Sequence, residues 1–405
     1  MKSVLFLLDY YLPNASANGI CASKVIQKFL EEGIQVSVVC YRGESICRMG
    51  GATEEVYSIA SHLPKRKGSH KVFYYLKWLF AKKRLPYENK RIGEELFGLA
   101  ENIVAKNAVD TVVCIHLPIE TLLVGKRLKD KYSHLNVVAY MLDSLSGGFL
   151  PRWLPAAFCR RKKINWENKN LNRFDKVILM ESSRPHHEKY SKSVNWYKEN
   201  SVFLDVPALV ASSRTSGKKN EREEIVVCFL GTMAPGVRSP YAFLDILFNI
   251  VDLKMKVLFI GKNSCDVSKY ITRSGNIHVD AKGELPYAMA QEYLDEADFL
   301  LNLGNVNPNL VPSKIFEYMA YGKPIISTYT CENDSSLQYL RKYPAVHLVD
   351  EKEKDRTALA ERLETFIKAH RNANISTASI EQYFYKNTPM ALYDFLIGGE
   401  KNEKL

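Results

Sequence analysis

The sequence contains no apolar run long enough to cross a membrane as a helix. A membrane-spanning helix needs about 18 or more consecutive apolar residues, whereas the apolar run at residues 4–8 stops at Asp9. That run is also too short for the apolar segment of a secretory signal peptide. We therefore expect the protein to stay in the cytoplasm.

Paired cysteines are also missing. The eight cysteines include no C-x-x-C pair, and several lie within apolar patterns typical of strands, such as Cys40 and Cys228. This arrangement predicts reduced cysteines in the core rather than a disulfide framework or a zinc site. His186, His187 and Glu188 have no partner pattern that would specify a metal either. We expect a protein without a bound metal.

Low-complexity tracts and short repeats are absent too, and the composition is that of a globular protein. Hydrophobic residues make up 46% and charged residues 25% of the chain, which excludes a disordered or collagen-like protein. A chain of 405 residues is too long for one core and fits two domains of about 150–200 residues each.

The net charge of +11 is distributed unevenly along the chain. Residues 1–204 contain 32 Lys and Arg against 19 Asp and Glu, a net of +13, whereas the remaining residues contain 24 against 26, a net of −2. The basic residues concentrate at 62–84 and 152–163, where aromatic residues are interleaved with them. This pattern suits an anionic membrane surface. Nucleic-acid binding remains open as an alternative. A solvated basic face with the aromatic residues in the core is a second alternative.

The first half of the chain has the pattern of a doubly wound α/β domain. A strand at residues 4–8 precedes a helix whose apolar positions repeat at helical spacing, and a second strand follows at residues 34–40. This β-α-β unit with a right-handed crossover begins a parallel sheet. We expect this Rossmann-like domain to span residues 1–205. Further buried strands are predicted at residues 111–115, 136–142 and 176–180.

A second α/β series follows a change of composition. Residues 206–223 are rich in Ser, Lys, Asn, Glu and Gly, which is typical of a linker or an exposed loop. Residues 224–379 then alternate buried strands with helices, and this predicts a second Rossmann-like domain. Its strands are expected at residues 225–230, 256–260, 276–279, 298–303, 324–328 and 345–349.

Residues 311–326, VPSKIFEYMAYGKPII, combine a helix start, an apolar stripe, a helix stop and a strand. Ser313 and Glu317 share one edge of this helix because they are four residues apart. Ser313, backbone N–H groups and Lys314 would face a phosphate, and Glu317 could accept both hydroxyls of a ribose. The alternative is an ordinary helix with Ser313 as its cap and Glu317 in solvent.

This segment resembles the donor-site signature of GT-B-type glycosyltransferases, P-S-K-x-x-E-Y-x-A-x-G-K-P-V/I-I. The resemblance extends over most of the chain and is strongest at residues 225–330. It implies two Rossmann-like domains that face a central cleft, with the last helix, within residues 380–405, packed back on the N-terminal domain. It also implies that the C-terminal domain binds a nucleoside diphosphate sugar and that the N-terminal domain binds the acceptor.

Loops at strand ends of the second domain supply further candidates for the donor site. Gly231 permits a close approach of the backbone, and Arg238 can bind the leaving diphosphate through two nitrogen atoms. A turn glycine and a surface arginine are the structural alternative. Gly261 and the segment with Gly283 and Leu285 follow later strands at the same sheet edge. The resemblance places the latter segment near the nucleobase.

The chain departs from the retaining members of this group at two positions. Asn309 stands where they usually carry a Glu, eight residues before Glu317. An amide can hydrogen-bond a sugar hydroxyl but cannot supply negative charge to a cationic transition state. Leu142 takes the place of the histidine in their His-Asp pair, and Asp143 remains. Asp143 could be the general base that deprotonates an acceptor hydroxyl, or it could cap the turn that follows it.

Two other residues lie where the first sheet would bind a ligand. Gly19 opens the first helix, where a glycine can bring a backbone N–H to a phosphate or to the acceptor. It is a single glycine and not a full G-x-G-x-x-G motif. His116 also lies at a strand end, and we expect it to be a satisfied loop or core histidine.

The residues and the resemblance together predict a glycosyltransferase that moves a sugar from a nucleoside diphosphate sugar, with UDP favoured, to a hydroxyl of a membrane-associated, lipid-linked glycan of a bacterial surface polysaccharide. No metal or other cofactor is expected, because the helix dipole, Lys314 and Arg238 would neutralise the diphosphate. The expected location is the inner face of the cell membrane, with an anionic membrane surface and no nucleic acid as partner. A sugar-nucleotide epimerase of the same fold and a non-catalytic or nucleic-acid-binding protein that kept the fold are the alternatives.

Overall fold

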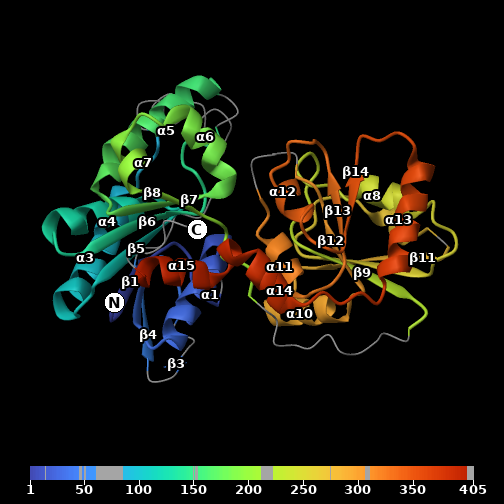
Figure 1. Cartoon of the computed structure of the whole chain (residues 1–405), viewed down its shortest axis with the longest axis horizontal. Coiled ribbons are helices and arrows are strands. Elements are labelled where there is room, and N and C mark those ends of the chain that lie inside the picture. Colours follow the sequence, from blue (N-terminus) through green and yellow to red (C-terminus); the bar gives the residue numbers. More distant parts are fainter. Residues whose placement is uncertain are drawn as a thin grey trace. The chain divides into compact units, whose positions relative to one another are not determined.

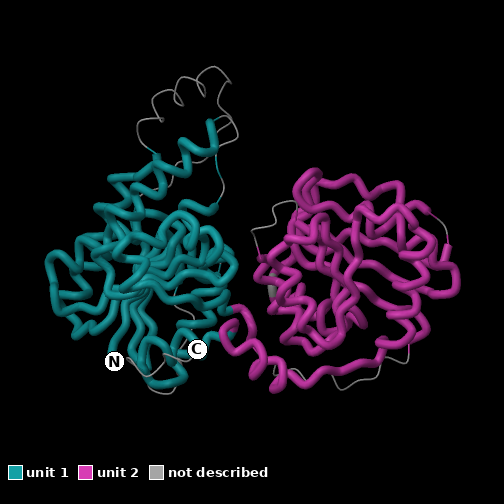
Figure 2. Tube along the Cα trace, turned by 45° about the horizontal axis from the view of Figure 1, so that its top comes forward, with its two compact units in different colours: residues 1–207, 388–405 teal, residues 208–387 magenta. Residues whose placement is uncertain are grey.

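The chain forms two compact units (Figure 2). The first consists of Met1–Pro207 and Thr388–Leu405, and the second consists of Ala208–Asn387. The first unit therefore contains both ends of the chain. The computed structural model describes residues 1–13, 15–44, 48–49, 52–60, 85–148, 150, 154–210, 222–273, 275–305 and 311–398.

A sheet of eight strands in the order β3-β4-β2-β1-β5-β6-β7-β8 lies at the centre of the first unit (Figure 1). All neighbouring strands are parallel except β3, which is antiparallel to β4. The strand order reverses between β1 and β5. The strands are β1 (Ser3–Leu7), β2 (Gln35–Cys40), β3 (Arg48–Met49), β4 (Ala52–Ser58), β5 (Thr111–His116), β6 (Asn136–Met141), β7 (Lys176–Met180) and β8 (Ser201–Leu204).

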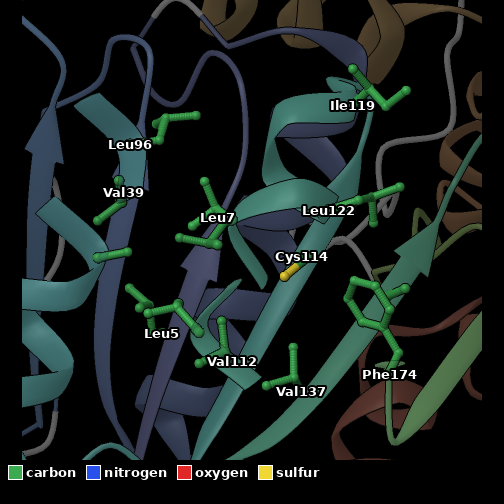
Figure 3. Packing of buried hydrophobic residues seen from close by; sticks show 14 of the residues in the cluster. Leu5, Leu7, Val39, Leu96, Val112, Cys114, Ile119, Leu122, Val137 and Phe174 are labelled. Carbon is green, nitrogen blue, oxygen red and sulfur yellow. The ribbon is translucent and has the colours of Figure 1, made fainter. Parts of the chain in front are cut away.

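Helices cover both faces of this sheet because successive residues of each strand point to opposite sides. Leu5 and Leu7 of β1 pack with Leu96 and Leu122 on one face (Figure 3). Phe6 belongs to the core of the other face. The helices are α1 (Ala17–Glu31), α3 (Lys90–Lys106), α4 (Ile119–Lys131), α5 (Ala156–Asn170), α6 (Arg184–Tyr190), α7 (Asn195–Asn200) and α15 (Pro389–Ile397), with 3₁₀ turns at Leu171–Arg173 and Glu181–Ser183.

The second unit contains a sheet of six parallel strands in the order β11-β10-β9-β12-β13-β14. Its order reverses between β9 and β12. The strands are β9 (Ile225–Leu230), β10 (Met255–Ile260), β11 (Ile277–Gly283), β12 (Phe299–Asn302), β13 (Ile325–Tyr329) and β14 (Val346–Asp350). The helices are α8 (Tyr241–Leu247), α9 (Ser268–Ile271), α10 (Tyr287–Glu296), α11 (Lys314–Ala320), α12 (Leu337–Leu340), α13 (Arg356–His370) and α14 (Thr377–Tyr383), followed by a 3₁₀ turn at Tyr385–Asn387.

Both sheets have the doubly wound α/β topology that the sequence predicted. The C-terminal segment differs, because the helix expected within residues 380–405 is interrupted. α14 packs with α11 in the second unit, whereas α15 packs on α1, where Phe29 and Tyr393 make an edge contact at 5.1 Å. Thr388 begins the return, since its hydroxyl accepts the Ala391 N–H at 3.3 Å and so caps α15. Most of the expected linker, residues 211–221, lies outside the described residues.

The cysteines of the described residues are packing residues. All seven have free thiols, and all except Cys331 are buried. Burial raises the pKa of Cys228 in β9 to about 12, so this thiol stays protonated. Among the described helices, none is both long enough and apolar enough to span a membrane.

Candidate functional site

Three of the predicted glycines meet at the carboxyl edge of the second sheet. Open α/β sheets bind ligands at this edge, beside the point where the strand order reverses, which here is between β9 and β12. The Gly231 N–H donates to the Ile260 carbonyl at 2.9 Å, and the Gly261 N–H donates to the Gly283 carbonyl at 2.7 Å. The ends of β9, β10 and β11 therefore lie side by side, as the sequence predicted for one sheet edge.

Steric crowding and positive φ angles explain why glycine occupies positions 261 and 283. A Cβ on Gly261 would lie 2.3 Å from the Gly231 carbonyl oxygen, and the φ of Gly261 is 121°. Gly283 has a φ of 72°. Both φ values lie in the region that residues with side chains avoid. The edge is therefore built from backbone, which a ligand can approach closely.

Arg238 lies beside this backbone edge. A tight turn positions it, because Ala234 and Arg238 exchange two backbone hydrogen bonds of 2.9 Å. Its Nη1 lies 3.6 Å from the point that a Cβ on Gly231 would occupy. Its Nε is buried and has no hydrogen-bond partner in the described part of the chain. Burial lowers the pKa of Arg238, but a guanidinium stays protonated at neutral pH. The result is a cation with an unfilled donor, which suits an anion.

Helix α11 is attached to the same edge by one side chain. The hydroxyl oxygen of Tyr318, which is 1% exposed, accepts the Leu230 N–H at 2.8 Å, and its O–H donates to the Leu230 carbonyl at 3.3 Å. Leu230 is the last residue of β9. This contact fixes α11, and the residues before and within it, against the strand next to the topological reversal.

The predicted residues of α11 are paired with each other. Lys314 Nζ lies 2.7 Å from Glu317 Oε2, and Glu317 is only 8% exposed. Glu317 is therefore not in solvent, which excludes the alternative that it is a solvated residue of an ordinary helix. Ser313 occupies the N-cap position of α11, but it has helical φ and ψ and its side chain makes no capping hydrogen bond. Its carbonyl accepts the Phe316 N–H at 3.2 Å.

In the first unit, Asp143 follows β6 at the carboxyl edge of the sheet. Its carboxylate makes no hydrogen bond or ion pair with another residue of the described ranges, and burial raises its pKa. The Asp143 carbonyl instead accepts a hydrogen bond from His116 Nδ1 at 2.7 Å. His116 is 1% exposed, burial lowers its pKa to about 4, and its Nε2 has no partner among the described residues. His116 is thus a core histidine, as expected, but only one of its two ring nitrogen atoms has a partner among the described residues.

Gly19 has a different role from the one the sequence suggested. Its N–H donates to the Ser16 hydroxyl at 3.0 Å, and that hydroxyl donates to Asp9 at 2.6 Å. A Cβ on Gly19 would lie 1.9 Å from the Tyr10 carbonyl oxygen. The glycine therefore allows the loop after β1 to cross the start of α1, and its amide serves as the capped group of α1 instead of facing a phosphate.

Comparison with known proteins identifies the fold. No known family profile matches the chain, and no curated protein matches it in sequence. Solved structures match along its length. A glycosyltransferase from Rickettsia africae ESF-5 has a TM-score of 0.60 at 11% identity, with 98% of this chain and 99% of that chain covered. Anabaena HepE, solved in complex with UDP and glucose, has a TM-score of 0.58 at 14% identity, with 98% and 100% covered.

A third structure is WaaG, a glycosyltransferase involved in lipopolysaccharide biosynthesis. It has a TM-score of 0.57 at 14% identity, with 98% of this chain and 100% of that chain covered. The chain has the GT-B fold. At these identities the likeness concerns the fold, and the roles of individual residues have to be argued from their own contacts.

Two residues of this GT-B chain that sequence reasoning missed, Gly304 and Thr328, fix the backbone directly after β12. The Gly304 N–H donates to Thr328 Oγ1 at 2.8 Å, and Thr328 Oγ1 donates to Glu351 at 2.6 Å. A Cβ on Gly304 would lie 2.9 Å from the Thr328 carbonyl oxygen. Gly304 follows a buried strand, so the rule that singled out Gly231 and Gly261 could have found it.

The remaining sequence predictions concern Leu285, Asn309 and the first basic aromatic stretch. Leu285 is half-buried in the segment between β11 and α10. Asn309 lies outside the described residues, as do residues 62–84 of the first basic aromatic stretch. Within the described ranges, no group of three or more His, Cys, Asp or Glu side chains is arranged to hold a metal ion.

Proposed function

We propose that this chain is a glycosyltransferase that moves a sugar from a nucleoside diphosphate sugar, with UDP-sugars favoured, to a hydroxyl group of an acceptor. The observation that carries the proposal is the carboxyl edge of the second sheet, where Arg238 lies over Gly231 and α11 is tied to the end of β9. A buried cation beside backbone that a ligand can approach closely suits a diphosphate. The complex of HepE with UDP and glucose supports the choice of nucleotide.

In this proposal Arg238 and Lys314 bind the diphosphate, and Glu317 accepts hydrogen bonds from the ribose hydroxyls. Because Lys314 Nζ contacts Glu317, the donor phosphate would compete with that carboxylate for the ammonium group. The negative charge that develops on the leaving diphosphate is then balanced by two protein cations, without a metal.

Asp143 is the proposed general base. It takes the proton of the acceptor hydroxyl while the acceptor oxygen bonds to the anomeric carbon and the bond from that carbon to the diphosphate breaks. The nucleoside diphosphate leaves with the electron pair of that bond. Burial raises the pKa of Asp143, which makes it a stronger base than an exposed aspartate.

The acceptor is proposed to be a lipid-linked glycan at an anionic membrane. The excess of basic residues in the first half of the chain supports this, together with the exposed Arg161 and Lys162 beside the exposed Phe158 on α5. Basic residues around an apolar side chain are typical of contacts with anionic lipid.

A donor screen followed by product analysis tests the proposal. Differential scanning fluorimetry against UDP-, GDP- and dTDP-sugars should show thermal stabilisation by at least one of them. The stabilising donor, incubated with a polyprenyl-diphosphate-linked oligosaccharide, should then increase the acceptor mass by one sugar residue. Isomerisation of the donor sugar without an acceptor would instead identify an epimerase. Absence of stabilisation by every donor would contradict the proposal.

A further inference from the structure

The loop that begins at Asp143 is fastened by side chains from two helices. The Ser146 N–H donates to Oε1 of Glu167, on α5, at 2.9 Å. The Ser146 hydroxyl lies 2.8 Å from Nε2 of His186, on α6. Nε2 of the next residue, His187, lies 3.0 Å from the Ser144 hydroxyl. Two residues of the loop are therefore held at three points.

The loop is also folded tightly on itself. The Gly147 N–H donates to the Ser144 hydroxyl at 2.9 Å, and the Gly148 N–H donates to the Ser144 carbonyl at 2.8 Å. A Cβ on Gly147 would lie 2.9 Å from the Ser144 hydroxyl and 3.2 Å from the His186 ring. A shift of Ser146 would therefore be transmitted to Ser144, the neighbour of Asp143.

His187 and His116, on either side of the loop, are themselves buried and hydrogen-bonded. His187 is completely buried, packs edge-on against Trp196 at 5.9 Å, and has its Nδ1 3.4 Å from the Ser191 hydroxyl. On the other side of Asp143, its carbonyl is held by His116 at 2.7 Å. Asp143 is therefore bordered by fixed contacts in both directions.

Glu167 is the unusual member of this group because it is a completely buried carboxyl group. Oε1 accepts the Ser146 N–H, but Oε2 has no hydrogen-bond partner among the described residues. Burial raises its pKa to about 7, and hydrogen bonding with Ser146 and the charge of Lys163 oppose that rise only partly. A buried carboxyl group with an unfilled oxygen is costly for stability, so its use suggests a demand for a defined geometry at Ser146.

We propose that Glu167 is a positioning residue of the transfer reaction, which holds the Ser146 amide and thereby fixes the loop that presents Asp143 to the acceptor hydroxyl. This inference rests on the proposed function, in which Asp143 is the base. The donor residues belong to the other compact unit, so loss of this contact should reduce turnover without changing donor affinity.

Two substitutions separate the hydrogen bond from the charge. Glu167→Gln keeps an oxygen that can accept the Ser146 N–H and should keep kcat within about threefold of the wild type. Glu167→Leu has a similar size but no acceptor, and it should lower kcat about tenfold or more with an unchanged donor Kd in calorimetry. Glu188→Leu, an exposed glutamate on α6, is the control and should have normal kcat.

A coupling experiment shows whether Glu167 acts through Asp143. In an Asp143→Asn background, Glu167→Leu should cause little further loss of kcat, because residues that act as a unit are not additive. Hydrogen exchange should also show faster exchange of the Ser146 amide in Glu167→Leu. If this variant does not fold, Glu167→Asp, which withdraws the acceptor by one methylene, should show the same pattern of low kcat and unchanged donor Kd.

The outcomes distinguish failure of the proposed function from failure of the proposed role of Glu167. Absence of sugar transfer by the wild type contradicts the proposed function itself, and normal turnover of Asp143→Asn contradicts the base. A slow Asp143→Asn variant combined with a normal Glu167→Leu variant overturns only the role of Glu167. Equal losses in Glu167→Gln and Glu167→Leu would also overturn it, because they would assign the effect to charge and not to the hydrogen bond.

Discussion

Arg238 and Lys314 are the cations of the proposed donor site. Replacing either by Ala should weaken binding of the preferred nucleoside diphosphate sugar by roughly ten- to a hundredfold, because a charge-assisted contact is worth about 1.5–3 kcal/mol. Isothermal titration calorimetry gives this affinity. Lys254→Ala is the matched control, since Lys254 precedes β10 at the opposite edge of the same sheet and pairs with Glu223. Unchanged affinity in both site variants would remove the donor-site assignment.

Asp143→Asn tests the proposed general base. The amide keeps the shape of the side chain but cannot accept a proton, so kcat should fall by about 10²- to 10⁴-fold while donor affinity stays normal. Because burial raises the pKa of Asp143, wild-type kcat should decline on the acid side at a pH above the usual range of an aspartate. An exposed control, Asp130→Asn, should have wild-type kinetics. Near-normal turnover of Asp143→Asn would end its assignment as the base.

The sequence could supply the identities of these residues but only part of their surroundings. Asp143 was found because the resemblance places a His-Asp pair after the strand at residues 136–142, and Arg238 because it follows a strand and a glycine. The contact between His116 and the Asp143 carbonyl joins the ends of two strands, so no local pattern contains it. The pairing of Lys314 with Glu317 was accessible from their spacing of three residues, yet the resemblance directed attention to separate roles for them.

Among the elements, α11 depends on the contact between Tyr318 and Leu230. Tyr318→Phe would leave both backbone groups of Leu230 without this partner, which should lower the free energy of unfolding by about 1–3 kcal/mol. It should also weaken donor binding, because α11 carries Lys314 and Glu317. Urea unfolding and calorimetry measure the two effects. Tyr383→Phe, at a 63% exposed position, should change neither, and a fully stable Tyr318→Phe variant would contradict the role of this hydroxyl.

A second element-scale prediction concerns Lys323, which lies in the Gly-Lys-Pro run after α11. Its Nζ donates to the carbonyls of Leu294, Asp295 and Ala297 at 2.9, 2.5 and 2.7 Å. Lys323 therefore satisfies the C-terminal end of α10. Lys323→Met should lower the free energy of unfolding by about 1–3 kcal/mol, measured by urea unfolding, whereas the exposed Lys342→Met should not. Equal stability of both variants would show that water replaces Lys323 at these carbonyls.

Elements with strong apolar patterns were predictable, and those that depend on tertiary contacts were not. β5, β6, β9 and β10 lie within a residue or two of the expected strands. β4 was missed because Glu54 interrupts its apolar pattern, although in the fold Glu54 is buried and accepts the Tyr11 hydroxyl. The helix expected within residues 380–405 is split because Thr388 caps a new helix, a local signal that the apolar composition obscured.

For the molecule as a whole, chain length and the alternation of strands with helices predicted two α/β units, and the strand orders confirm their doubly wound topology. The return of the chain to the first unit at Thr388 came from the resemblance and not from any periodicity, because packing of α15 on α1 is a contact between distant segments. The charge asymmetry is a property of the whole chain that the sequence gives completely. The excess of positive charge lies entirely in residues 1–204.

The last prediction follows from this asymmetry. With +13 on residues 1–204 and −2 on the remainder, attraction to an anionic surface should act on the first half of the chain. In liposome co-sedimentation, we expect binding that requires anionic lipid and decreases as salt increases. Reversing Arg161 and Lys162 on α5, or Lys82, Lys83 and Arg84, to Glu should weaken it by at least about fivefold for each charge removed.

The matched control reverses two exposed lysines of the second unit, Lys352 and Lys354, to Glu. This variant changes the net charge as much as the α5 variant does, so equal losses in both would assign the effect to total charge and not to a membrane-binding surface. Phe158→Ala adds a separate measurement, because an inserted aromatic contributes apolar burial that salt does not screen. The loss of liposome binding caused by Phe158→Ala should therefore persist at high salt. Equal binding to neutral and anionic vesicles, or no binding at all, would mean that the basic side chains are a solvated face and that the acceptor is soluble.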